Sequence, residues 1–540
     1  MLHANKTRLF TGRTCGPHEC ASQSTMATLG QIIDRNAWLG PERAAVVYGS
    51  LRLTHGQFAA RVRRLSSSLW QRGLGHQERF SILAMNCVEF LECYGASQWA
   101  GFIINTVNFR LSAAEIEFIL QDVAPRLLIF EAQYAGLVAT LRPQLPGIEL
   151  YICIGEVPQC AADWAESYEG MLGSADDSGP PFRSRSDDYC CIVYTSGTTG
   201  KPKGVLHTNH SMARCAEIVS SELGFGGDCR LLACAPLFHV GASTMSWGAG
   251  FRGGCTVLHR GFDSKEILRT VEVERINAIH LVPTMVRSLL SAPDFHEHDL
   301  SSLRMLMYAA APMPLPLLKQ AVAAFGAITY NGYGQTEINF ITSLKPHQHI
   351  LDGTPEQSRR LSSVGQPHWQ CEIRIVAEDG QDARSGEVGE IVAKSQTAMA
   401  GYWNNSVATL ATIRDGWVYT GDLGYVDEQG YLFLVDRKKD MIISGGENVY
   451  SREVEEVVAQ HPAVYESAVV GVADAQWGEA VHAVVVLKPE CTVNASELIA
   501  FCRTRIAAYK CPKFVSFVAG LPRLNTGKVD KAALRGGSNV

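Results

Sequence analysis

The stretch that decides the fold is residues 190–204, which read C-C-I-V-Y-T-S-G-T-T-G-K-P-K-G. Its apolar start, Cys190–Tyr194, is typical of a buried strand, and a segment compatible with a helix follows the loop. Glycines let the backbone turn sharply and bring N–H groups close to an anion, while hydroxyls and lysines add donors and positive charge. We therefore predict a phosphate-binding loop rather than a surface loop without a ligand. It is not a Walker A loop, because only two residues separate Gly197 from Gly200.

Strand and helix patterns alternate on both sides of this loop. Apolar clusters predict strands at 80–84, 127–130, 150–153, 278–282 and 305–308. Helical signals predict helices through residues 58–69, after the N-cap residue Ser112, at 284–290 and after Pro314. Such alternation indicates parallel sheets covered by helices. The two runs, before and after residue 190, suggest two related subdomains.

The pattern changes toward the C-terminus. Strand-rich sequence follows Gly386, the charged segment Asp436–Asp440 interrupts the chain, and a mixed pattern of helices and strands comes after it. The mixed region has helical patterns at 453–460 and 495–505 and strand patterns at 467–472, 481–487 and 514–517. We expect an α/β protein with a large N-terminal domain of two related parallel-sheet subdomains plus a β-rich part, and a small α+β C-terminal domain. The expected boundaries are a flexible extension over 1–25, the large domain over 26–436, a hinge over 437–440 and the small domain over 441–540. Whether translation starts at Met1 or Met26 is left open.

Composition narrows the class of protein. The 540 residues are 46% hydrophobic and 19% charged, which excludes general disorder, and the net charge of −6 argues against broad nucleic-acid binding. The 16 cysteines are too sparse for a disulfide scaffold, so we expect reduced thiols and a cytoplasmic location. No secretory signal is visible. Residues 231–251 lack charges but contain proline, histidine and several glycines, which predicts buried protein rather than an integral membrane segment.

Further motifs follow the loop in the sequence. They are Y-G-Q-T-E at 333–337, Y-T-G-D at 419–422, I-S-G-G-E-N at 443–448 and N-T-G-K at 525–528. Together with the loop they resemble the AMP-binding, adenylate-forming superfamily, which includes acyl-CoA synthetases, firefly luciferase and the adenylation domains of peptide synthetases. The resemblance extends from near Leu29 to Leu534. It implies that the small domain is mobile and swings about a hinge at Lys439.

The resemblance also assigns the nucleotide site. It implies contacts from Thr195, Ser196, Gly197, Thr198, Thr199, Gly200, Lys201, Lys203, Ala310, Ala311, Pro312, Tyr333, Gly334, Asp422 and Arg437. In the family Thr336 contacts the α-phosphate and Glu337 holds Mg²⁺, which suits a hard carboxylate ligand. Asp422 and Arg437 are the ribose contacts. Ala309 and Ala310 stand where relatives carry glycines beside the adenine, so the fit is looser there.

Catalysis and the acyl site are assigned in the same way. The resemblance implies that Lys528 acts in adenylation together with Thr336 and Glu337. It places the acyl pocket and the thiol tunnel at His239, Val240, Gly241, Gly332, Gly445, Gly446 and Glu447. Ser451 replaces a proline of many relatives, and we expect this change to alter local stiffness more than chemistry.

The expected activity is that of an ATP-dependent acyl-CoA synthetase. Its substrates are a carboxylic acid, ATP with Mg²⁺, and coenzyme A, with AMP and pyrophosphate released. Small residues at 332–334, 241–242 and 248–250 leave room for a medium- or long-chain fatty acid, unless they only allow close helix packing. The alternatives are an aryl or alicyclic acid–CoA ligase, an enzyme that loads a separate carrier protein, and a non-catalytic nucleotide-binding relative. The acid, the acceptor, the pathway and the oligomeric state, including a homodimer, are left open.

Overall fold

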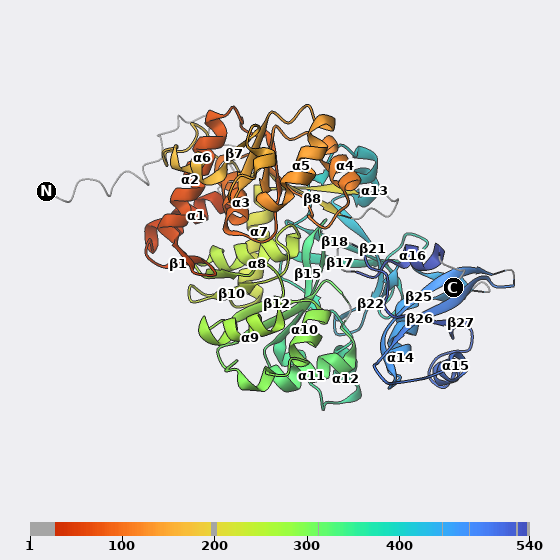
Figure 1. The fold of residues 1–540 in the computed structure, drawn as a ribbon. Helices are drawn as coiled ribbons and strands as arrows, with labels where there is room; N and C mark the ends of the chain where they lie inside the picture. The colour runs from red at the N-terminus through yellow and green to blue at the C-terminus, as the bar shows by residue number, and fades with distance from the viewer. Residues whose placement is uncertain are drawn as a thin grey trace, which may run out of the picture.

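The structure is a computed structural model that describes residues 28–195, 202–311, 313–444, 447–474, 476–524 and 528–536. A large body contains the N-terminal and central parts of the chain, and a smaller C-terminal unit lies against one side of it (Figure 1). The predicted α/β class is confirmed, with two sheets in the large body that are mainly parallel, a β-rich part and a small mixed unit.

The first large sheet has eight strands in the order β19-β9-β8-β4-β3-β5-β6-β7. Its strands are β3 (Arg79–Leu83), β4 (Ile103–Thr106), β5 (Leu127–Glu131), β6 (Leu150–Ile154), β7 (Ala165–Ser167), β8 (Tyr189–Thr195), β9 (Lys203–Thr208) and β19 (Gly401–Tyr402). The helices of this part of the chain are α1 (Leu29–Leu39), α2 (His55–Gln71), α3 (Val88–Ala100), α4 (Ala113–Val123), α5 (Ala135–Leu141) and α6 (Tyr168–Gly173). Strands β3 to β8 are parallel, whereas β9 returns antiparallel to β8 after the predicted phosphate loop.

The second large sheet has nine strands in the order β16-β15-β14-β13-β12-β10-β11-β1-β2. Its strands are β1 (Ala44–Tyr48), β2 (Leu51–Thr54), β10 (Arg230–Ala233), β11 (Cys255–Leu258), β12 (Ala278–Leu281), β13 (Met305–Ala309), β14 (Thr329–Gln335), β15 (Asn339–Leu344) and β16 (Gln366–Pro367). The accompanying helices are α7 (Asn209–Glu222), α8 (Val240–Phe251), α9 (Ser264–Val273), α10 (Pro283–Leu290), α11 (Leu315–Phe325) and α12 (Pro355–Arg360). The hairpin β1–β2 precedes the first sheet in sequence yet joins the second, where Val46 pairs with Thr256.

The remaining elements form two five-stranded sheets. The β-rich part contains β17 (Cys371–Val376), β18 (Gly389–Ser395), β20 (Ile413–Arg414), β21 (Trp417–Val426), β22 (Leu432–Arg437) and α13 (Ser406–Thr412). The small unit contains β23 (Ile442–Ser444), β24 (Glu447–Val449), β25 (Val464–Asp474), β26 (Gly478–Leu487), β27 (Phe514–Phe517), α14 (Ser451–Val458), α15 (Ala495–Arg503) and α16 (Lys531–Gly536). Short 3-10 turns occur at Ala132–Tyr134, Arg142–Gln144, Gln159–Ala161, Phe295–Glu297 and Pro346–Gln348.

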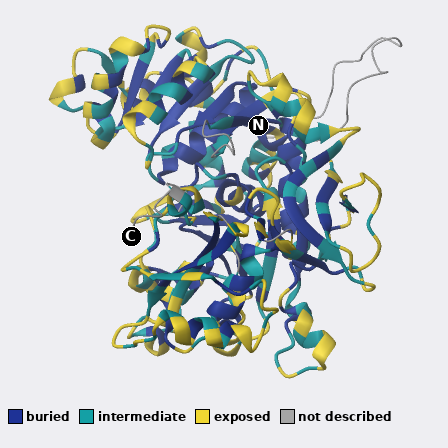
Figure 2. Cartoon of the chain, turned by 90° about the vertical axis from the view of Figure 1, so that its right-hand side faces the viewer, coloured by how far each residue is buried: buried dark blue, intermediate teal, exposed yellow. Residues whose placement is uncertain are grey.

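The central strands are buried between helices, as Figure 2 shows in dark blue. The predicted helix start at Ser112 is confirmed, because the Ser112 hydroxyl accepts from the N–H of Glu115 while the Glu115 carboxylate accepts from the N–H of Ser112. Residues 231–251 fold into β10 and α8 in the interior. Among the described residues, no helix is both long and apolar enough to span a membrane. The described cysteines are free thiols.

Candidate active site

The centre of the site is the carboxylate of Asp422, on β21. Its strand neighbour is Arg437, the last residue of β22, and the two are opposite each other in the antiparallel ladder. The Nε of Arg437 lies 2.6 Å from Oδ1 of Asp422. The Asp422 side chain is buried, whereas that of Arg437 is 44% exposed. The two predicted ribose residues are therefore brought together at the end of the β-rich sheet.

Strand β14 supplies two further donors to the same carboxylate. The Tyr333 hydroxyl donates to Oδ2 of Asp422 over 2.8 Å, and Nε2 of Gln335 donates to the same oxygen over 2.6 Å. Burial, followed by the charge of Asp422, raises the pKa of Tyr333 well above its ordinary value, so the hydroxyl keeps its proton. These contacts join the nine-stranded sheet to the β-rich part. They fix the position of one buried carboxylate.

The backbone at Gly334 fits only a glycine. A Cβ at Gly334 would lie 1.6 Å from the backbone oxygen of Asn339, because β14 and β15 shift register at this point. The tight turn leads directly into Thr336 and Glu337. The predicted metal ligand is thus placed at the carboxyl end of β14.

Glu337 is held by an aromatic residue from another sheet. Its Oε1 accepts from the hydroxyl of Tyr402 over 2.9 Å, and the Nζ of Lys203 lies 5.0 Å from the centre of the Tyr402 ring. The backbone oxygen of Thr336 lies 2.8 Å from Nε2 of His207, whose pKa burial lowers to about 4. A neutral His207 therefore carries its proton on Nε2 and donates to this carbonyl. Strands β9 and β19 thus position the Thr336–Glu337 turn.

The residues around Glu337 fit one particular mode of Mg²⁺ binding. Among the described residues, no three carboxylate, histidine or cysteine side chains gather as a complete metal cage. Mg²⁺ is commonly bound by one or two carboxylates plus substrate phosphates and water. A single partly exposed carboxylate beside a predicted phosphate loop matches that mode.

Lys528, from the small unit, lies within the electrostatic influence of this site. Its pKa is lowered, first by removal from bulk water and then by the nearby charge of Arg437, while Asp422 and Glu337 oppose the shift. Its side chain keeps solvent-accessible surface although protein surrounds it, as expected for a group in a space between two units. The predicted catalytic lysine and the two predicted acidic residues therefore share one electrostatic environment.

His239 is the residue immediately before α8, and Lys528 lies close enough to act on it. Burial lowers its pKa to about 4, and the charges of Lys528 and Arg110 act in the same direction. Its ring packs against Phe238, with ring centres 4.3 Å apart. His239 is therefore a neutral imidazole within the field of Lys528.

The small residues of the predicted acyl pocket have two different roles. A Cβ at Gly241 would meet only Cε1 of His280, at 3.9 Å, so there is room beside this position. A Cβ at Gly248 would lie 2.6 Å from Cγ1 of Val219, and one at Gly332 would lie 2.1 Å from Cε of Met307. The expected room beside Gly248 is thus absent, because this glycine allows α8 to pack on α7. The Cβ at Gly332 would also lie 2.9 Å from Cε2 of Phe340, so the expected room is absent there too. Val240 is buried.

The remaining predicted residues lie at strand ends, at exposed positions or outside the residues that the structure describes. Thr195 ends β8, Lys203 begins β9, and Glu447 begins β24 as an exposed residue. Ala310 adopts a left-handed conformation with φ of 69°, which is strained for a residue with a Cβ, and Ala311 is exposed. Ser196, Gly197, Thr198, Thr199, Gly200, Lys201, Pro312, Gly445 and Gly446 lie outside the described residues.

The predicted hinge is a turn between β22 and β23. The backbone N–H groups of Asp440 and Met441 both donate to the carbonyl of Arg437, and the Lys439 carbonyl accepts from Nη2 of Arg535 over 3.5 Å. Arg535 also pairs with Asp440 over 2.7 Å. The turn is therefore tied to α16 of the small unit.

Ser451, which stands where many relatives carry proline, makes contacts that a proline could not make. Its backbone N–H and its hydroxyl donate to Oδ2 and Oδ1 of the buried Asp436, over 2.5 and 3.1 Å. The Nζ of Lys531 donates to the same hydroxyl over 2.6 Å. A proline at 451 offers neither donor. The serine thus links β22 to α14 and α16.

Sequence reasoning missed three residues that organise the site. Gln335 lies inside a quoted motif, but its role needs the approach of β21. Tyr402 comes from a two-residue strand, and His207 follows the phosphate loop on β9. A polar histidine within the otherwise apolar G-V-L-H-T run was a local signal. Nothing local marks Tyr402.

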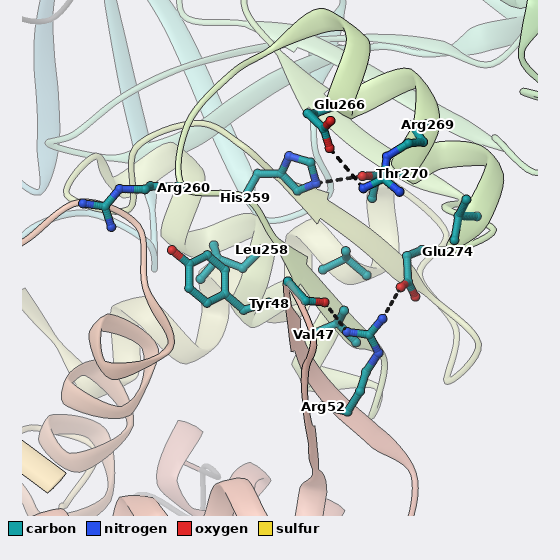
Figure 3. A pocket seen from close by; sticks show the side chains of 13 residues that line it. Val47, Tyr48, Arg52, Leu258, His259, Arg260, Glu266, Arg269, Thr270 and Glu274 are labelled. Carbon is teal, nitrogen blue, oxygen red and sulfur yellow. Dashed lines mark hydrogen bonds and ion pairs between the residues drawn. The ribbon is translucent and has the colours of Figure 1, made fainter. Parts of the chain in front are cut away.

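A cavity of about 340 Å³ lies at β1, β2, β11 and α9, far from Asp422 in sequence and sheet (Figure 3). Its Arg52 and Arg269 pair with Glu274 and Glu266, over 2.5 and 3.1 Å. Its cations are thus neutralised by acidic partners.

A smaller cavity, of about 50 Å³, borders the segment that carries His239. It is lined by Met85, Asn86, Phe109, Arg110, Cys234, Pro236, Arg260, Gly261, Phe262 and Met285. Arg110 is one of the two charges that act on His239. This narrow space therefore lies beside the loop that connects β10 to α8.

Comparison with known proteins identifies relatives over almost the whole chain. The sequence model for the AMP-binding enzyme matches residues 33–403, and that for the AMP-binding enzyme C-terminal domain matches residues 453–528. A feruloyl-CoA synthase from an Amycolatopsis species is 36% identical over 94% of this chain and 98% of its own. A medium/long-chain-fatty-acid–CoA ligase from Mycobacterium tuberculosis is 36% identical over 90% of this chain and 86% of its own. Among solved structures, o-succinylbenzoate CoA synthetase from Bacillus subtilis, in complex with an acyl-adenylate intermediate, has a TM-score of 0.82 at 30% identity, covering 94% of this chain and 98% of that one.

Proposed function

This chain belongs to the AMP-binding enzyme family, and from that premise we propose that it is an acid–CoA ligase that activates a bulky monocarboxylic acid. It is an enzyme of the acyl- and aryl-CoA ligase group, whose members use ATP and coenzyme A. The observation that supports the assignment is the Asp422 carboxylate, which Tyr333, Gln335 and Arg437 hold at the end of the β-rich sheet, where its charge acts on Lys528 of the small unit.

In the first half-reaction an oxygen of the substrate carboxylate attacks the α-phosphorus of ATP. The new O–P bond gives an acyl-adenylate, and the bond to the β-phosphate oxygen breaks so that pyrophosphate leaves. Asp422 accepts from the ribose hydroxyls, and Arg437 lies beside it. Lys528 offers a positive charge where negative charge gathers on phosphoryl oxygens, so its contribution is electrostatic.

Glu337 and Thr336 would hold the metal and the reacting phosphate. Mg²⁺ bound at Glu337 supplies charge neutralisation of the phosphates. The Tyr402 hydroxyl keeps the Glu337 carboxylate in place through Oε1, and Oε2 would bind the metal. The donation from His207 fixes the Thr336 backbone, so that the threonine hydroxyl faces a defined direction. Thr195 and Lys203 flank the phosphate loop.

In the second half-reaction the thiol of coenzyme A attacks the acyl carbonyl, and AMP leaves. We propose that the small cavity beside Arg110 and Pro236 lies on the approach for this thiol, next to the segment that leads from Pro236 to His239. The small domain turns at Lys439, Lys528 withdraws, and the segment Gly445–Glu447 takes its place. The neutral state of His239 avoids a fixed positive charge in the path of the acyl group.

The acid is proposed to be bulky and mainly apolar. The room beside Gly241 supports this, since a side chain there would reduce the space next to α8. Relatives at the same identity are named for feruloyl and for medium- and long-chain fatty acids, so fatty and aryl acids are both candidates.

An acid panel tests this function. Pyrophosphate release is measured with ATP, Mg²⁺ and saturated fatty acids of increasing length, or aryl acids, and the CoA thioester is then detected by mass. We expect acid-dependent release of pyrophosphate and AMP, and a thioester that requires coenzyme A. Adenylate without a CoA thioester would favour carrier loading. Nucleotide binding without acid-dependent release would establish a non-catalytic relative.

A further inference from the structure

One buried histidine of the large body has no hydrogen-bond partner. His280 lies on β12 and is 9% exposed, and both of its ring nitrogens lack a partner. The other buried histidines of the described residues all have one. His55, His207, His349 and His368 contact the backbone oxygens of Gly253, Thr336, Lys345 and Phe340. A buried polar group without a partner is disfavoured, so His280 needs an explanation.

The position of His280 places its ring between β12 and α8. It is opposite Met307 in the parallel pair β12–β13, and it shares a sheet face with Ala278, two residues earlier. Ala278 and Met307 pack in one cluster with residues of α7 and α8, such as Met245. The ring therefore faces α8 rather than the helices on the other side of the sheet.

The Cε1 corner of the ring is the part nearest to Gly241, and the two ring nitrogens beside it are themselves buried. Cε1, the carbon between the two nitrogens, is the atom nearest to a Cβ built on Gly241, at 3.9 Å. Gly241 itself is exposed and is the second residue of α8, two residues after His239. The unpartnered imidazole thus borders the space proposed for the body of the acid.

The charge state of His280 restricts what it can recognise. Burial lowers its pKa to about 4, so the ring is neutral at pH 7 and offers one N–H donor and one nitrogen acceptor. Burial is the sole cause of the shift, and no neighbouring cation or anion contributes. A neutral ring gives a hydroxyl both a donor and an acceptor, but it gives a second carboxylate no compensating charge.

We propose that His280 determines specificity at the acyl pocket by hydrogen-bonding a hydroxyl group carried on the body of the acid, remote from the reacting carboxylate. The inference rests on the proposed function and narrows its substrate class to hydroxylated acids, either aryl or fatty. His280 touches the substrate body and not the reacting atoms. It acts on the choice of acid and leaves the nucleotide chemistry unchanged.

The test compares acids that differ by one hydroxyl. The pairs are phenylpropanoic acid with its para-hydroxy derivative, and decanoic acid with its ω-hydroxy derivative. Acid-dependent pyrophosphate release gives kcat/KM for each, and the ratio within a pair is the readout. The variants are His280→Phe, which removes the polar atoms at similar size, and His280→Gln, which keeps a donor and an acceptor. Met307→Leu, the neighbour on the same sheet face, controls for repacking.

We expect the wild-type enzyme to prefer the hydroxylated member of at least one pair. His280→Phe should lower that preference roughly tenfold, the size of one net hydrogen bond at the upper end of its usual range. His280→Gln should retain part of it, and Met307→Leu should leave the ratio unchanged. His280→Phe should also raise the melting temperature without ligand, because it removes a buried group that lacks a partner.

Three results would overturn the inference in distinguishable ways. Equal ratios in wild type and His280→Phe, with acids still activated, refute the role of His280 while the ligase function stands. A lower melting temperature for His280→Phe together with unchanged ratios identifies a structural histidine that binds an ordered water. Absence of acid-dependent pyrophosphate release with any acid refutes the proposed function and the inference with it.

Discussion

Replacing Asp422 by asparagine tests the most connected group of the site. The carboxylate accepts from Tyr333 and Gln335 at one oxygen and pairs with Arg437 at the other, over 2.6 to 2.8 Å. An amide keeps one acceptor oxygen, so its NH₂ must face either the two strand donors or the guanidinium. A hydrogen bond to a charged group contributes about 1.5–3 kcal/mol. Arg437 is 44% exposed, so solvent reduces the loss on that side to about 1 kcal/mol or less.

The same exchange removes the charged acceptor proposed for the ribose hydroxyls. One such hydrogen bond corresponds to a rise in the dissociation constant of ATP of roughly 10- to 150-fold. Equilibrium titration with ATP measures this, with a thermal melt as the folding control. Asp382→Asn is the matched control, because Asp382 pairs with Arg374 at an exposed position of the same β-rich part and should leave ATP binding unchanged. ATP affinity within about threefold of wild type in a folded Asp422→Asn protein would refute the ribose assignment.

Three further predictions address the lysine, the inter-domain contact and the pocket. Because the pKa of Lys528 is lowered, kcat/KM for adenylation should fall as the pH rises through a value below the ordinary 10.5. Lys528→Arg should move this fall in kcat/KM to higher pH. A fall at an unchanged pH would assign it to another group. Ser451→Pro removes two donors to Asp436 and should slow adenylation several-fold, roughly the effect of one or two net hydrogen bonds. Ser451→Ala keeps the N–H and should slow adenylation less. Rates equal to wild type in both variants would show that the contact is dispensable. Gly241→Trp should depress kcat/KM for long or aromatic acids while sparing the shortest acid accepted, and a uniform loss with an unchanged melt would mean that Gly241 does not limit size.

The sequence predicts the layers of the fold better than their connections. Apolar runs and the capping signal at Ser112 are local, and β3, β5, β6, β12 and β13 appear where expected. The attachment of β1–β2 to the second sheet, and of β19 to the first, depends on contacts between distant segments. No local pattern carries that information.

The candidate site divides in the same way. Motif positions such as Asp422, Arg437 and Glu337 carry their chemistry in the side chain, and a resemblance transfers them directly. Tyr402 is recognisable only when β19 pairs with β9 beside Glu337. His280 lies in a short buried strand, where the sequence alone predicts an ordinary core residue. Its lack of a hydrogen-bond partner follows from the packing around it and has no signal in the sequence.

The most direct test of the central claim separates the two half-reactions in Lys528→Ala. Acyl-adenylate formation is measured from ATP and an accepted acid, and thioester formation is measured from supplied acyl-adenylate and coenzyme A. Loss of one placed electrostatic donor should slow the first reaction roughly 10²–10³-fold, or about 2.7–4 kcal/mol in transition-state stabilisation. The second reaction should stay close to the wild-type rate, because the proposed turn at Lys439 withdraws Lys528 from the site. Equal losses in both half-reactions would contradict the account.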